Sequence, residues 1–192
     1  MKHNLPASLV RDIKRFGVEE TESGLYVPRA NVSIGGVFEY EHRRAGEIID
    51  VSSSHNLVVN EGLNHILNVV LHGATATPTW YVGLFEGNYT PLAADTAATF
   101  PTSATECTAY SEATRQEYVE AAASGQSITN SAARATFTFN ASKTIYGAFL
   151  TSVSTKGGTT GVLLAADRGA VAKAVVSADQ LLVAYTLSIT AS

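Results

Sequence analysis

The chain has 192 residues, of which 45% are hydrophobic and only 16% are charged, and its formal net charge is −4. This length suffices for one domain with a sizeable core, alone or with an arm attached. The negative charge argues against nucleic acid as the main partner, because phosphate binding requires clustered Lys and Arg.

Targeting signals and cysteines narrow the class further. No apolar run approaches ~18 residues, and charges interrupt the N-terminus, so we expect neither a membrane span nor a signal peptide. Cys107 is the only cysteine, which excludes an intrachain disulfide and fits assembly in a reducing compartment. A soluble intracellular protein is expected.

The first 33 residues predict an arm. Four apolar side chains fall on one helical face, namely Leu9, Val10, Ile13 and Phe16, and Gly17 follows as a helix end. A helix of about three turns is not stable alone in water, so it must dock on its own domain or on a neighbour. Residues 24–28, which include Tyr26, are interpreted as an extended connector.

A hairpin and a helix follow the arm. Residues 37–42 and 47–53 flank a Gly-containing turn, which predicts two antiparallel strands. Residues 60–72 predict a helix with Asn60 as N-cap and Glu61 in the first turn. Its apolar stripe at helical spacing comprises Leu63, Ile66, Leu67, Val70 and Leu71. We expect one buried helix crossing a β domain.

The remaining sequence predicts short strands. Residues 79–86 are apolar on both faces, which indicates a central strand, and residues 87–105 form a long loop of the kind that serves function or covers an interface. Further strands are expected at 135–139, 145–151, 161–166 and 181–189, while 106–120 stays ambiguous. The fold class is therefore mostly β, an antiparallel β-sandwich or jelly roll over residues 34–192.

Catalytic and metal-binding patterns are not recognisable. His55, His65 and His72 lack zinc-ligand spacing, and Cys107 is interpreted as a small buried apolar side chain. No serine stands in a G-x-S-x-G turn, and the scattered carboxylates form no local pair. We expect no catalytic, metal or cofactor-binding residue, and no enzyme.

Trp80, Tyr81, Tyr89 and Tyr110 are candidates for a sugar-stacking platform. Trp80 and Tyr81 are neighbours on a strand and must point to opposite faces, so core packing is expected for Trp80. Tyr89, in the following loop, is expected to be the exposed ring. The candidate interface residues are thus Tyr26 and Tyr89 together with the apolar face of the arm.

Several segments resemble a group of small virion-associated structural proteins of tailed bacteriophages. They are residues 56–63 (NLVVNEGL), 79–85 (TWYVGLF), 95–100 (DTAATF), 110–112 (YSE) and 146–150 (YGAFL). The resemblance covers roughly residues 55–192 and implies a component of the phage particle, with a capsid decoration (cement) protein as first choice. It carries over no catalytic residues.

The resemblance implies the major capsid protein and further copies of this chain as partners, in a virion assembled in the host cytoplasm. Residues 1–33 are expected to make contacts with neighbouring subunits or with the shell. The alternatives are a tail-fibre subunit that binds host polysaccharide and a head–tail or tail-tube component that forms rings. A hydrolase is the least favoured reading.

Overall fold

The computed structural model describes residues 18–20, 26–28 and 32–191, with side chains from residue 32 onward. Its contacts divide the chain into two compact units, residues 34–188 and residues 1–33 with 189–192. In the smaller unit, β1 (Val18–Glu20) pairs antiparallel with β2 (Tyr26–Pro28). The expected connector at 24–28 is therefore wrong for residues 26–28, which form a paired strand. The predicted helix of the arm lies outside the described residues.

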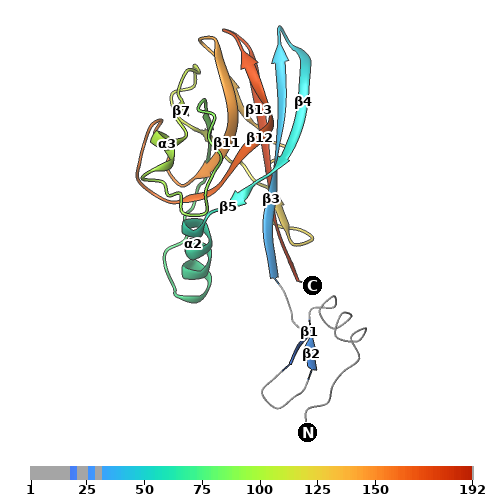
Figure 1. The fold of residues 1–192 in the computed structure, drawn as a ribbon. Helices are drawn as coiled ribbons and strands as arrows, with labels where there is room; N and C mark the ends of the chain where they lie inside the picture. Colours follow the sequence, from blue (N-terminus) through green and yellow to red (C-terminus); the bar gives the residue numbers. More distant parts are fainter. Residues whose placement is uncertain (1–17, 21–25, 29–31, 192) are drawn as a thin grey trace. The chain divides into compact units, whose positions relative to one another are not determined.

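Two antiparallel sheets form the sandwich that the alternating sequence predicts (Figure 1). One sheet has the order β10-β13-β3-β4, and β9 also pairs with β13. Its strands are β3 (Val32–Arg44), β4 (Glu47–His55), β9 (Ser127–Thr129), β10 (Ala135–Thr138) and β13 (Gln180–Ala191).

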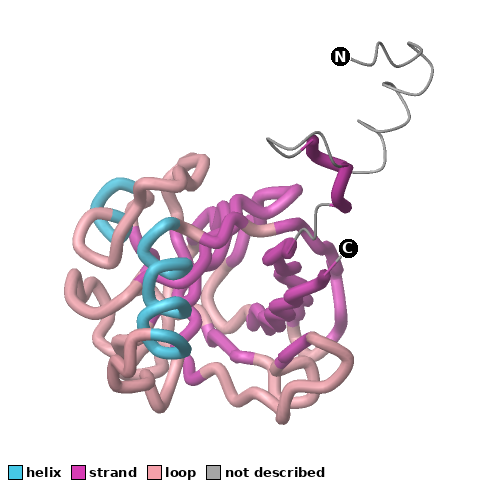
Figure 2. The backbone as a smooth tube through the Cα atoms, turned by 90° about the horizontal axis from the view of Figure 1, so that it is seen from below, coloured by secondary structure: helices cyan, strands magenta, loops and turns pink. Residues whose placement is uncertain are grey.

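The second sheet has the order β5-β12-β11-β6-β7, and β8 also pairs with β6. Its strands are β5 (Leu57–Val58), β6 (Tyr81–Phe85), β7 (Glu106–Cys107), β8 (Gln116–Glu117), β11 (Lys143–Thr151) and β12 (Leu163–Val175). The helices are α2 (Asn60–Leu71) and α3 (Phe100–Ser103), and both lie on the side of this second sheet (Figure 2).

The main core lies between the sheets. Its side chains include Phe38 from β3, Leu84 from β6 and Tyr185 from β13, all of which are fully buried. Phe38 and Tyr185 stack with ring centroids 4.4 Å apart. The predicted hairpin is confirmed, since Ala45 and Gly46 make the turn with positive φ angles of 49° and 86°.

A smaller core covers the outer face of the second sheet. Phe100 of α3 packs on Phe85 and Phe149, with centroid distances of 5.5 and 5.2 Å. The central position of β6 is thereby confirmed, and the loop at 87–105 supplies the cover. Glu61 fixes this loop by accepting hydrogen bonds from the backbone N–H groups of Ala97 (2.8 Å) and Leu163 (2.7 Å).

Two glycines explain how strands that are apolar on both faces pack here. In the pairing of β6 with β11, Gly83 lies opposite Phe149 and Gly147 lies opposite Phe85. A Cβ at Gly83 would lie 2.3 Å from the Phe149 ring, and one at Gly147 would lie 2.6 Å from the Phe85 ring. Each ring therefore lies over the glycine of the neighbouring strand.

The expectation of a buried helix is wrong. Within α2 only Gly62 is buried, and it lies against β12, where a Cβ would come within 2.4 Å of the carbonyl oxygen of Leu164. The row facing the sandwich is Gly62, Ile66 and Val69, rotated from the predicted stripe. Leu67, Val70 and Leu71 are instead exposed to 54, 71 and 79%.

The N-cap prediction also fails. Val59 caps α2 without a side-chain hydrogen bond, and Asn60 is already helical. The backbone N–H of Asn60 donates to the carbonyl of Ala93 at 2.9 Å, so the loop satisfies a group that a capping side chain would otherwise serve.

The two ends of the sandwich differ in chemistry. The hairpin end, at the tip of β3 and β4, holds the polar side chains His42, Arg44, Asp50, Lys173 and Asp179. Figure 1 shows α2 projecting at the opposite end. This helix end holds an apolar pocket.

Candidate functional site

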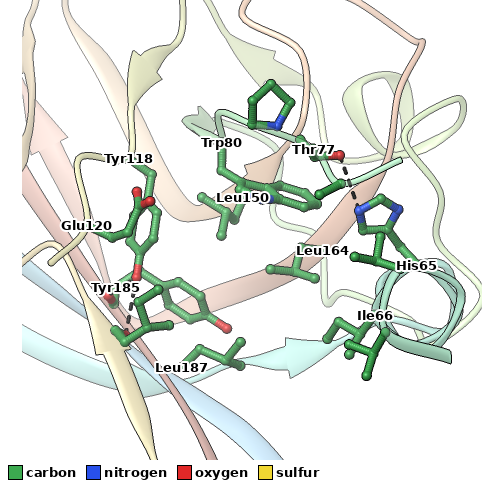
Figure 3. Close-up of a pocket in the computed structure, with 15 residues that line it drawn as sticks. His65, Ile66, Thr77, Trp80, Tyr118, Glu120, Leu150, Leu164, Tyr185 and Leu187 are labelled. Atoms are coloured by element: carbon green, nitrogen blue, oxygen red, sulfur yellow. Dashed lines mark hydrogen bonds between the residues drawn. The ribbon is translucent and has the colours of Figure 1, made fainter. Parts of the chain in front are cut away.

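An apolar pocket lies at the helix end of the described part of the chain. It has a volume of about 290 Å³ and lies between α2, the segment at 76–80 and the open end of the two sheets (Figure 3). Its apolar walls come from Ile66 and Val69 of α2, Leu150 of β11, Leu164 of β12 and Leu187 of β13. Such mainly apolar concavities are the usual places for ligands or partner side chains to bind.

Trp80 lines one side of the pocket. It is half-buried, packs against the main core as expected, and also meets His65 edge-on at a centroid distance of 5.5 Å. His65 Nε2 lies 3.2 Å from the hydroxyl of Thr77, a hydrogen bond that fixes the imidazole beside the indole. Segment 76–80 is therefore attached to α2 by this pair.

Two tyrosines close the pocket on the other side. The Tyr118 hydroxyl donates to the carbonyl oxygens of Tyr185 (3.1 Å) and Ile128 (3.3 Å), and the Tyr185 hydroxyl accepts from Asn56 Nδ2 at 3.0 Å. Burial raises the pKa of both phenols, so each stays neutral at physiological pH. The Tyr118 hydroxyl thus donates within the fold, and the Tyr185 hydroxyl accepts within it.

One charged side chain stands at the rim. Glu120 lines the pocket, is exposed, and forms no ion pair with any residue that the structure describes. The site is thus apolar inside and acidic at its edge. It offers binding by shape and apolar contact, with Glu120 available to a cationic group.

Of the predicted interface residues, the structure describes the side chain of Tyr89 alone, which does not line this pocket. Leu9, Val10, Ile13 and Phe16 lie outside the described residues, and of Tyr26 the structure describes only the backbone in β2. Tyr89 is half-buried: its ring meets Phe100 edge-on at 5.9 Å, and its hydroxyl donates to Asp95 at 2.8 Å. Its contacts hold the covering loop in place.

Two of the groups considered for chemistry, Cys107 and His65, have structural roles. Cys107 is buried as predicted, and burial raises the pKa of its thiol to about 11, which keeps it protonated. His55 and His72 are exposed, while His65 takes part in the pocket wall. Between residues 32 and 191, no three His, Cys, Asp or Glu side chains converge as metal ligands would. Neither described helix is long and apolar enough to cross a membrane.

A buried ion pair missed by the sequence reasoning secures the loops beside β7. Arg115 is 1% exposed, donates to both oxygens of Glu106 at 2.9 and 2.7 Å, and also donates to the carbonyls of Val153 and Gly158. Each of the three guanidinium nitrogens donates within the fold, so this buried pair organises the loops.

The pocket residues on α2 and Trp80 were also missed as a site. The sequence did contain a sign of this site, since the helix carries more apolar residues than one contact face needs.

No protein-family model matches the chain, and no curated protein sequence is similar to it.

Proposed function

We propose that this protein is a non-enzymatic structural component of a tailed-phage particle that binds the capsid shell as a decoration protein. The sequence resemblance supports the phage assignment. The structural observation that supports an assembling subunit is the orientation of β4 at the edge of its sheet.

In the middle of β4, polar side chains point inward and two apolar side chains point outward, on a face that also carries polar Ser53. Asp50 and Ser52 face the other sheet, where both contact the buried ammonium of Lys173, with Ser52 Oγ at 2.7 Å from Lys173 Nζ. Ser54 likewise donates to Asp167. The outward residues Ile49 and Val51 are 49 and 63% exposed.

In a monomer, this arrangement would leave the apolar side chains on the outer face of β4 exposed to water, which is unfavourable. Ile48, next to the turn, adds a third exposed apolar side chain at 54%. Exposed β-branched residues on an edge strand invite association with another chain, which native proteins usually prevent with charge or cover. A subunit that works by covering a shell uses such a surface for its contact, without chemistry.

The test compares two lysine substitutions on the outer face of β4. Val51→Lys places a charge in the apolar surface, and the matched control Ser53→Lys places the same charge two residues along, on the same face and also exposed. We expect Val51→Lys to reduce co-sedimentation with capsid shells that lack this protein by at least tenfold, with Ser53→Lys close to wild type.

The outcome separates the alternatives. Absence of wild-type binding to shells, or binding to purified tails instead, would overturn the decoration role. Equal binding of the two variants would remove the β4 surface from the contact. Unfolding midpoints of both variants in urea confirm that each chain is folded when it is tested.

A further inference from the structure

We infer that the pocket at the helix end receives the N-terminal segment of a second copy of this chain, residues 6–16. The inference concerns self-association and holds or fails independently of the phage function.

The pocket calls for an apolar occupant. Three polar groups of its wall are engaged within the fold: His65 with Thr77, Tyr118 with two backbone carbonyls, and the Tyr185 hydroxyl as acceptor from Asn56, while the charge of Glu120 lies at the rim. A polar ligand would lose its own hydration on entry between these mainly apolar walls. An apolar side chain enters at no such cost.

The pocket continues outward as an apolar surface on α2. Val70 both lines the pocket and is 71% exposed, and Leu67 and Leu71 extend the surface along the helix. An amphipathic helix docks on surfaces of this kind by placing side chains at i, i+3, i+4 and i+7 into the groove. The groove therefore fits a short helix better than a single small molecule.

The sequence of this chain contains a segment with the required pattern. Leu9, Ile13 and Phe16 are spaced at i, i+4 and i+7, and a helix of this length needs a docking surface to be stable. The same segment carries Arg11, Lys14 and Arg15, which complement the acidic rim at Glu120. Apolar pattern and charge therefore both match.

Exchange between two copies accounts for the area that a stable contact requires. One short helix in one groove buries less than the roughly 1,000 Å² expected of a specific interface. In a twofold dimer each copy gives its segment and receives the other, so the contact is made twice.

Trp80 provides a direct measurement of occupancy. It is the only tryptophan of the chain and lines the pocket, and residues 1–17 contain none. The probe is a synthetic peptide of residues 1–17, added to the full chain carrying Ile13→Ser and Phe16→Ser so that its own segment competes weakly. We expect a saturable blue shift of Trp80 emission and reduced quenching by acrylamide.

The control peptide carries the same two serine substitutions and should bind at least tenfold more weakly. A second full-chain variant, with Val70→Lys added, should lose the response to the unmodified peptide, because the substitution places a charge of the same sign as the peptide's at an exposed position of the groove. An unchanged Trp80 signal with the unmodified peptide would overturn the assignment of the occupant.

A disulfide experiment distinguishes a second copy from the chain's own segment. Two differently tagged chains are mixed, one with Phe16→Cys and one with Val70→Cys, while buried Cys107 is left in place. We expect an oxidised heterodimer that does not form when Val171→Cys, 59% exposed on β12 outside the pocket, replaces Val70→Cys. A third chain carries both Phe16→Cys and Val70→Cys. If a disulfide formed within this single chain but none formed between the two differently tagged chains, the exchange between copies would be overturned.

Discussion

The two ends of the sandwich meet their burial requirements in opposite ways. At the hairpin end, Asp179 accepts hydrogen bonds from Arg44 Nε and Nη2 at 2.9 and 2.7 Å, from His42 Nε2 at 2.9 Å and from the Val176 N–H at 2.9 Å. At the helix end, the walls are apolar and the space between them stays open.

The difference follows from what each kind of group requires. A buried polar group costs free energy unless it is paired within the fold, so the hairpin end has to be complete in the single chain. Apolar side chains do not need a specific partner, and their exposure to water in the single chain costs only a moderate free energy. Surfaces for assembly are therefore expected among the apolar groups, on α2 and on the outer side of β4.

The largest effect is expected from breaking the polar end with Asp179→Ala. Asp179 is 1% exposed, and its loss leaves buried His42 without its acceptor. Removing one member of such a buried network costs about 3 kcal/mol. Urea unfolding at pH 7 measures this loss, and Glu47→Ala, at an exposed position of the same hairpin, is the matched control.

The same variant has a defined pH dependence. The hydrogen bonds from Arg44 hold the pKa of Asp179 below its ordinary value of about 3.9. A lowered pKa in the folded state stabilises the fold above the unfolded value, and this contribution disappears as the pH falls through the folded value. The difference in free energy of unfolding between wild type and Asp179→Ala should therefore become smaller below about pH 4. A difference of constant size would contradict this assignment.

A smaller loss is expected at the helix end from Gly62→Ala. Helix propensity alone predicts a gain of about 1 kcal/mol, whereas the added Cβ would meet the backbone of Leu164 at 2.4 Å. Backbone cannot move aside as a flexible side chain can, so we expect a net loss of about 2 kcal/mol. Thermal unfolding measures it, and Trp80 emission should report an altered pocket.

The control for this prediction is Gly35→Ala in β3. A Cβ at Gly35 has no heavy atom within 4 Å, so its free energy of unfolding should change by less than about 0.5 kcal/mol. If Gly62→Ala proved stabilising, α2 would have to shift freely on β12, and the pocket would not be preformed.

The sequence predicts those features whose cause is local. The turn at Ala45 and Gly46 needs positive φ, and the nine-residue alternation near the C-terminus can only be a half-buried strand. Both were recognised from neighbouring residues alone. The covered faces of β6 were recognised in the same way, from apolar residues at successive positions.

Features caused by distant residues could not be predicted. Contacts with Lys173 and Asp167 determine which face of β4 points inward. These two residues are more than 110 positions away from their partners Ser52 and Ser54. Likewise β12 continues to Val175 through Asp167, whose polar side chain interrupts the apolar pattern but is buried because Tyr40 donates to it at 2.8 Å. The periodicity of α2 gave its apolar face without showing how much of that face the sandwich covers.

The smallest effect on stability is expected from Leu71→Ser on the exposed face of α2, and its value lies in the contrast with Asp179→Ala. Leu71 is 79% exposed, so the folded chain gains little from its apolar side chain, and the free energy of unfolding should change by less than about 0.5 kcal/mol. Self-association, measured by sedimentation velocity over a range of concentrations, should nevertheless weaken, because the substitution removes apolar contact area from the groove. Asn68→Ser, exposed on the same helix but polar, should leave both quantities unchanged. A large loss of stability in Leu71→Ser would mean that this face already packs within the single chain, and the distinction between the two ends of the sandwich would fail.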